Sequence, residues 1–126
     1  MVKEILMSAR LSITMAKETW AQISKRKLST YPKCKICKMR DATQLHHGIE
    51  WKMKKHKKVI DVEENGIELC QVCHDIAQNY DTAQMVWDIN LERYGAERMS
   101  NFVFNLQEVM KAVPAWLIEK AKECME

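Results

Sequence analysis

Near the N-terminus, apolar residues recur at helical spacing at Ile13, Ala16, Trp20 and Ile23. This period predicts an amphipathic helix, for which Ser12 or Thr14 could serve as the N-cap. We expect Trp20 to lie in the core, because a single large aromatic side chain on such a stripe is usually well buried.

The predicted N-terminal helix closes with three basic residues, Lys25, Arg26 and Lys27. Positive side chains suit the negative C-terminal end of a helix dipole. Two interpretations of these residues stay open, namely solvated side chains at the helix end or contacts to a phosphate group. The pair Tyr31 and Pro32 then breaks the helix.

The middle of the chain predicts a strand, a loop, a second strand and a helix. We expect the first strand over 44–49 and a charged loop over 51–64. Asn65 and Gly66 form a turn signal, and the second strand follows over 66–69. A short helix from Gln71 to about Tyr80 completes this unit.

Helical periodicity returns after this unit and continues toward the C-terminus. Asp81 can cap a helix that ends at Tyr94, with Gly95 as its stop signal. Pro114 begins a last short helix. Between these two helices, an apolar stripe predicts a further helix through Met99, Phe102, Val103, Leu106, Met110 and Val113.

The length and composition suit one small domain with appended helices, because the chain has 126 residues of which 47% are hydrophobic. We therefore predict a mainly helical α+β fold. Its parts would be an N-terminal helical arm over 1–31, a core over 32–80 and C-terminal helices over 81–126.

The net charge of +3 hides an uneven distribution. From Lys25 to Lys58 there are 12 Lys or Arg against 2 Asp or Glu, which gives +10 and leaves −7 for the remainder. Such asymmetry is typical of a nucleic-acid contact surface, because basic side chains that neutralise phosphates supply most of the sequence-independent affinity. The five lysines of the 51–64 loop are the main DNA-binding candidates: Lys52, Lys54, Lys55, Lys57 and Lys58.

Four of the five cysteines form two CxxC pairs, Cys34 with Cys37 and Cys70 with Cys73. Two such pairs separated by about thirty residues have the spacing of a tetrahedral four-cysteine zinc site. We predict one structural Zn²⁺ that ties the segment before the first strand to the second helix. Cys124 remains outside this set and would be a free thiol.

The cysteines and the start of the chain together indicate the cellular compartment in which we expect the protein. The start of the chain, MVKEILMSAR, has no sustained apolar stretch, and no segment has the length needed to span a membrane. Cysteines in a chain without a secretory signal favour a reducing compartment. We therefore expect a cytoplasmic protein without a membrane partner, and the sequence leaves its oligomeric state open.

The runs LHHGIEW and DVEENGIELCQVCH carry the most specific pattern in the chain. His46 and His47 are adjacent, and eight residues separate Asn65 from His74, which directly follows the second CxxC pair. This pattern resembles the zinc-stapled branch of the HNH endonucleases, over about Pro32 to Asn79. The resemblance implies a small ββα-metal core with flanking N- and C-terminal helices.

The same resemblance implies a role for each motif residue. His46 and His74 would hold one divalent cation, Mg²⁺ or Mn²⁺, with Ni²⁺ and Zn²⁺ as alternatives. His47 would be the general base in hydrolysis of a phosphodiester bond, because a neutral imidazole is basic at physiological pH. Asn65 would orient His47 by a hydrogen bond and brace the loop.

A weaker resemblance covers the C-terminal runs LERYGAERM and AWLIEKAKE, which look like the final helices of the NinG family of phage recombination nucleases. The expected partner is DNA, either duplex or branched, bound through its backbone and shape. Three alternatives to an active nuclease stay open. They are a catalytically inactive zinc-stapled DNA-binding module, an accessory protein of phage recombination or packaging, and a structural zinc domain for protein interactions.

Overall fold

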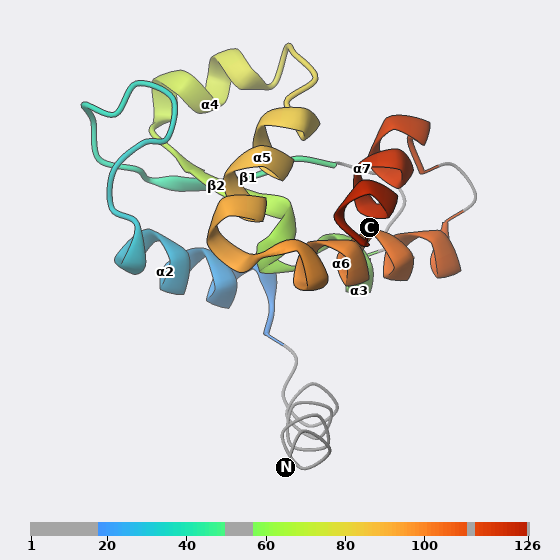
Figure 1. Cartoon of the computed structure of the whole chain (residues 1–126). Coiled ribbons are helices and arrows are strands. Elements are labelled where there is room, and N and C mark those ends of the chain that lie inside the picture. Colours follow the sequence, from blue (N-terminus) through green and yellow to red (C-terminus); the bar gives the residue numbers. More distant parts are fainter. Residues whose placement is uncertain (1–17, 50–56, 111–112, 126) are drawn as a thin grey trace.

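The computed structural model describes residues 18–49, 57–110 and 113–125. The fold is mainly helical, with one small antiparallel sheet, as the sequence predicts (Figure 1). The elements, in chain order, are α2 (Trp20–Thr30), β1 (Gln44–His47), α3 (Lys57–Ile60), the 3-10 turn η2 (Glu63–Asn65), β2 (Gly66–Leu69), α4 (Gln71–Ala77), α5 (Ala83–Tyr94), α6 (Ala96–Val109) and α7 (Ala115–Met125).

Helix α2 begins later than its apolar stripe predicts. Its N-cap is Thr19, whose side chain accepts a hydrogen bond from the backbone of Gln22, while the Gln22 side chain accepts one from the backbone of Thr19. This reciprocal capping box satisfies backbone N–H groups that the first turn leaves unpaired. The proposed caps Ser12 and Thr14 lie outside the described residues.

The two strands pair in one register, with His46 opposite Ile67 and His47 opposite Gly66. Strand β1 ends at His47, two residues earlier than predicted, because the chain bends at Gly48. A Cβ atom at Gly48 would lie 2.7 Å from Cβ of Val86, so only glycine fits here without a shift of α5. The absence of a side chain at Gly48 therefore lets α5 pack closely against the end of the strand.

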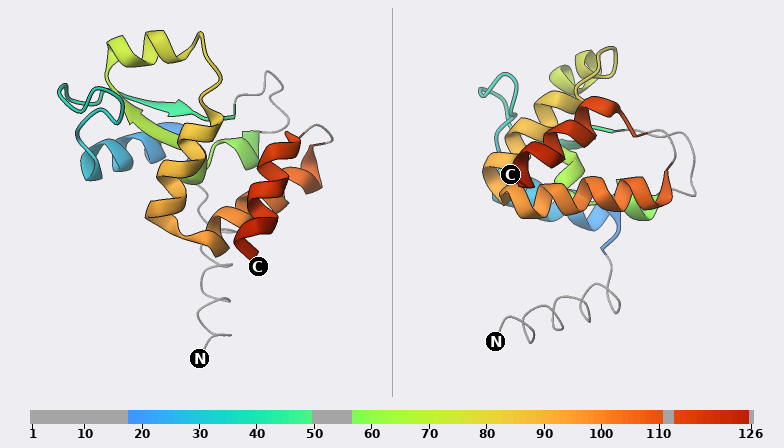
Figure 2. Two further views of the ribbon diagram at one scale, coloured as in Figure 1. Left: turned by 45° about the horizontal axis from the view of Figure 1, so that its top comes forward. Right: turned by 45° about the vertical axis from the view of Figure 1, so that its right-hand side comes forward.

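Helices α2 and α4 lie on opposite sides of the β1–β2 hairpin (Figures 1 and 2). Successive strand residues point to opposite faces, so His46 and His47 face different helices. Ile67, opposite His46, is buried with Cys34, Cys70 and Cys73 on the α4 side. On the other side, a Cβ atom at Gly66 would lie 2.9 Å from the Trp20 ring of α2.

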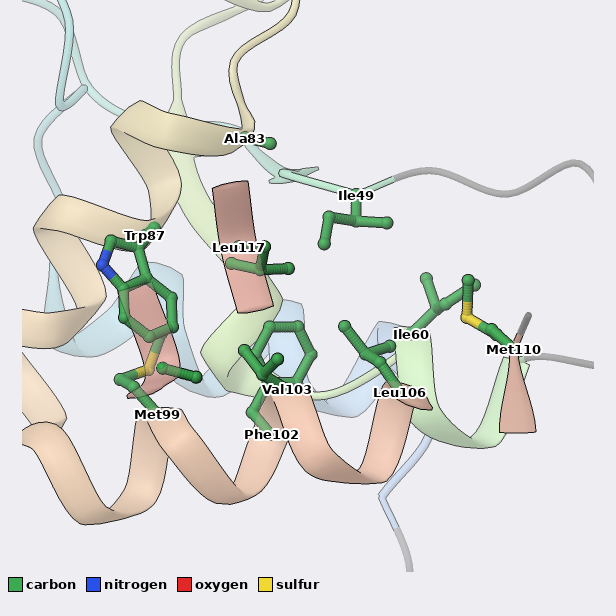
Figure 3. Packing of buried hydrophobic residues seen from close by; sticks show 11 residues of the cluster. Ile49, Ile60, Ala83, Trp87, Met99, Phe102, Val103, Leu106, Met110 and Leu117 are labelled. Atoms are coloured by element: carbon green, nitrogen blue, oxygen red, sulfur yellow. The ribbon is translucent and has the colours of Figure 1, made fainter. Parts of the chain in front are cut away.

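Two elements replace part of the predicted loop over 51–64. Residues Lys57–Ile60 form α3, and Glu63–Asn65 form η2. Ile60 of α3 is buried, with Ile49, against α5, α6 and α7 in the larger hydrophobic cluster, so this segment packs on the core and is not a solvated loop (Figure 3). The cluster also contains Ala83, Trp87, Met99, Phe102, Val103, Leu106, Met110, Leu117 and Ala121.

The C-terminal helices largely follow the sequence prediction. Helix α4 ends at Ala77 and not near Tyr80. Asp81 accepts a hydrogen bond from the backbone of Ala83 at the start of α5, which ends at Tyr94 as expected. Gly95 has a φ of 88°, a left-handed conformation that suits glycine, and α6 starts directly after it. Helix α6 ends at Val109, earlier than the predicted stripe.

Lys27 is buried, so it is neither a solvated side chain at the helix end nor a contact to a phosphate group, and both interpretations of it from the sequence are wrong. Its side chain is 1% exposed, and its Nζ donates to the carbonyl oxygens of Glu63 and Gly66, each at 2.8 Å. Glu68 is also buried, 3.6 Å from Lys27 Nζ, and accepts two hydrogen bonds from Arg93 at 2.9 and 2.6 Å. This charge cluster joins α2, β2 and α5.

Candidate metal centres and histidine pair

The two CxxC pairs meet at one point of the fold. Cys34 and Cys37 lie in the turn before β1, Cys70 is the N-cap of α4, and Cys73 lies in the first turn of that helix. All four sulfur atoms lie within 4.8 Å of one another, and those of Cys37 and Cys70 are 4.0 Å apart. A tetrahedral site with Zn–S bonds of about 2.3 Å requires sulfur separations of about 3.8 Å. The cluster therefore fits a structural zinc ion.

The ionisation of the cluster also fits a cation. Burial disfavours the Cys34 thiolate, but backbone N–H groups outweigh this effect and lower its pKa to about 6. Burial and the neighbouring sulfurs raise the pKa of Cys73 to about 12. If all four sulfurs were deprotonated, they would repel one another at this distance, and a bound dication would relieve that repulsion. Within the described residues, this is the one group of three or more Cys, His, Asp or Glu side chains arranged to hold an ion.

His46 and His74 come together across the interface between β1 and α4. Their ring centroids are 5.4 Å apart, and the ring planes meet at 81°. His46 is buried and His74 is half-buried. The cysteine cluster lies at the base of the same helix, so it fixes α4 relative to the hairpin. Two imidazoles that converge in this way could serve as ligands of a second ion, because imidazole binds several divalent metals.

The hydroxyl group of Thr82 also belongs to this site. Its Oγ1 lies 2.6 Å from Nε2 of His46, within hydrogen-bond distance. A cation bound through this nitrogen would have to replace the hydroxyl group as its partner. Thr82 precedes α5, and no sequence motif points to it, because it lies 36 residues from His46.

His47 lies on the opposite face, between α2 and the segment after α3. Its Nε2 lies 2.8 Å from Oδ1 of Asp61. The indole of Trp20 stacks on its ring, with centroids 3.7 Å apart and planes at 11°. Trp20 is half-buried, so it lies at the edge of the core and not within it, and its ring covers a candidate functional side chain.

Asn65 braces the backbone around the bend but does not orient His47 as the resemblance implies. Its side-chain oxygen accepts from the backbone of Ile49 at 2.8 Å. Its amide donates to the carbonyl oxygens of Ile49 and Ile60 at 2.9 and 3.0 Å. These hydrogen bonds occupy the buried side chain, and Asp61 makes the hydrogen bond to His47 instead.

Of the lysines proposed to bind DNA, Lys57 and Lys58 belong to helix α3. Lys58 is exposed on this helix and lines a cavity with Asp61. The side chain of Lys57 and all of Lys52, Lys54 and Lys55 lie outside the described residues. Arg26, in contrast, is paired with Glu18 and Glu63 at 2.6 and 2.7 Å, which accounts for its charge within the fold.

No described helix combines the length and the apolar character that a membrane crossing requires. No family model, curated protein or solved structure matches the chain. The four-cysteine cluster within a small α+β fold is therefore the feature that defines the site.

Proposed function

We propose that this chain is a metal-dependent endonuclease of the HNH type, which hydrolyses phosphodiester bonds in DNA. The observation that carries the proposal is the convergence of His46 and His74, whose ring centroids are 5.4 Å apart beside a zinc-type cysteine cluster. The adjacent His47 points to the other face, where it contacts a carboxylate. Two neighbouring histidines with separate surroundings are suited to separate roles.

In this proposal, His46 and His74 hold a divalent cation, Mg²⁺ or Mn²⁺ in the first instance and Ni²⁺ or Zn²⁺ as alternatives. Such an ion supplies positive charge for the phosphate and for the departing oxygen. His47 accepts a proton from a water molecule as that water attacks phosphorus. The bond from phosphorus to the 3′ oxygen breaks, the 3′ oxygen takes up a proton from solvent, and the other end keeps a 5′-phosphate.

DNA is the proposed substrate because the segment from Lys25 to Lys58 is strongly basic. Lys58 is exposed on α3, three residues before Asp61, the carboxylate partner of His47. Phosphate groups held along this basic segment would therefore pass close to the proposed general base. Backbone contacts of this kind position a duplex without reading its bases.

The second candidate is a zinc-stapled DNA-binding module that does not cleave. The 2.6 Å distance between His46 Nε2 and the Thr82 hydroxyl favours it, because this nitrogen already has a partner. In this case the histidine pair would be a packing contact between β1 and α4.

A plasmid-nicking assay tests the proposal. Supercoiled DNA is incubated with the zinc-loaded protein and Mg²⁺, Mn²⁺, Ni²⁺, Zn²⁺ or EDTA. We expect nicked DNA with at least one of the metals and none with EDTA. His47→Ala, purified in parallel, controls for a contaminating nuclease, and Cys124→Ser is the matched neutral variant. Tight DNA binding without nicking under any metal would support the second candidate.

A further inference from the structure

Asp61 and Trp20 hold the imidazole of His47 from two directions. The carboxylate of Asp61 lies 2.8 Å from Nε2, within hydrogen-bond distance, and the Trp20 indole covers one ring face at 3.7 Å. The side chains of His47 and Asp61 are 22% and 13% exposed, so solvent competes little with this hydrogen bond. Neither partner is one of the residues to which the sequence pattern gives a role, namely His46, His47, Asn65 and His74.

We propose that Asp61 is a positioning residue, which keeps the proton of neutral His47 on Nε2 and leaves Nδ1 as the nitrogen that accepts a proton from water. The role of His47 as general base rests on the proposed function; the tautomer does not. A neutral imidazole has one donor and one acceptor nitrogen, whereas a carboxylate only accepts. The nitrogen that faces Asp61 must therefore carry the hydrogen.

The backbone around Asp61 is itself fixed by Asn65. The amide of Asn65 donates to the carbonyl oxygen of Ile60, the residue directly before Asp61, at 3.0 Å. The same amide also donates to the carbonyl of Ile49, two residues after His47. Asn65 thus ties together the two chain segments that carry His47 and Asp61, and it acts on His47 through the backbone and not by direct contact.

Asp61 can be changed without opening the hydrophobic core. It lines a cavity of about 630 Å³ between α2, α3 and α6, whose wall also includes Lys58, Asn101 and Asn105. The cavity is partly open to solvent, so water can take the place of the removed carboxylate. We therefore expect Asp61→Ala to fold, which makes it a usable test variant.

The direct measurement is the tautomer of His47 in the parent protein. Long-range ¹H–¹⁵N correlation spectra distinguish protonated from unprotonated ring nitrogens, and His47→Gln identifies the His47 signals. At a pH where the ring is neutral, we expect hydrogen on Nε2 in the parent and loss of this preference in Asp61→Ala. A parent ring with hydrogen on Nδ1 would overturn the inference, and this readout does not require cleavage.

The kinetic measurement compares Asp61→Ala with Asp88→Ala, which removes an exposed carboxylate on α5. For positioning partners the expected loss is about 10- to 100-fold, and we expect it in kcat with KM and Mn²⁺ affinity nearly unchanged. An Asp61→Ala variant with the kcat of the parent would overturn the positioning role. If the parent does not cleave DNA at all, the proposed function fails, and the tautomer measurement still decides whether Asp61 orients His47.

Discussion

The indole of Trp20 lies parallel to the imidazole of His47, with ring centroids 3.7 Å apart and an angle of 11° between the planes. This stacking places the first turn of α2 against the face of the β1–β2 sheet that lies opposite α4. Gly66, directly opposite His47 in the sheet, makes room for the indole, because any Cβ there would meet the ring at 2.9 Å. The N-terminal helix is therefore part of the candidate site.

The first prediction concerns this stacking. Trp20→Ala should lower the free energy of unfolding by at least the roughly 0.5–1.5 kcal/mol of an aromatic pair, whereas Trp20→Phe should retain most of the stability. Urea denaturation of the zinc-loaded proteins measures both. If the phenylalanine variant loses as much stability as the alanine variant, ring stacking on His47 contributes nothing.

The second prediction concerns the structural zinc. Cys70→Ser should lose the bound ion and most of the cooperative unfolding transition, because Cys70 is both a proposed ligand and the N-cap of α4. Metal analysis of the purified protein, together with thermal unfolding, checks this result.

Cys124→Ser is the matched control, because Cys124 lies on α7, outside the cluster. It should keep one zinc ion per chain. A parent protein without zinc, or a Cys70→Ser variant with unchanged thermal stability, would contradict the prediction.

The third prediction follows from the burial of Lys27. Desolvation is the largest effect on this amine and lowers its pKa to about 8, against an ordinary value of 10.5. Between these two values the unfolded chain binds more protons than the folded chain, so the free energy of unfolding rises with pH. The slope from Lys27 is at most about 1.4 kcal/mol per pH unit.

Urea unfolding of the parent and of Lys27→Met between pH 8 and 10 measures this slope as a difference. Glu68, Arg93 and Tyr94 also face the amine. Burial raises the pKa of Tyr94 above its ordinary value of 10.0, so its opposite contribution grows as the unfolded tyrosine ionises near pH 10. Lys27→Met keeps Tyr94, so this contribution cancels in the difference. If the two proteins share one slope, Lys27 does not titrate in this window.

The fourth prediction concerns the basic segment. Replacement of Lys54, Lys55, Lys57 and Lys58 by alanine should weaken DNA binding. It should also reduce the log–log dependence of affinity on salt by about 0.9 for each phosphate group that the variant no longer neutralises. Fluorescence anisotropy with a labelled duplex at several salt concentrations measures both effects. An unchanged slope would mean that these lysines do not neutralise phosphate groups.

Local spacing in the sequence predicts the parts of the site that lie on short motifs. The CxxC pairs, and the placement of His46 and His47 on opposite faces of one strand, follow from residues close together in the chain. Helix α5 likewise ends at Tyr94 because Gly95 can adopt a positive φ.

Partners chosen by tertiary packing could not be predicted in this way. Asp61 reaches His47 only because α3 turns the segment back, and the helical structure of α3 depends on burial of Ile60 in the distant C-terminal core. Lys27 continues the stripe of Trp20 and Ile23 at helical spacing, and this position on the inner face of the helix was an indication that Lys27 is buried. The helical spacing alone is not enough, because Lys27 can be buried only with the buried Glu68 on β2 nearby, and the spacing does not show that contact.

In the proposed mechanism, His46 and His74 hold a catalytic cation while His47 acts on the water. Calorimetric titration of Mn²⁺ into zinc-loaded parent, His46→Ala, His74→Ala and His47→Ala proteins tests it most directly, with a plasmid-cleavage time course on each sample. We expect His46→Ala and His74→Ala to lose Mn²⁺ affinity. His47→Ala should bind Mn²⁺ like the parent but cleave about 10² to 10⁴ times more slowly. Parent-rate cleavage by His47→Ala, or loss of Mn²⁺ from His47→Ala but not from His46→Ala, would contradict the claim.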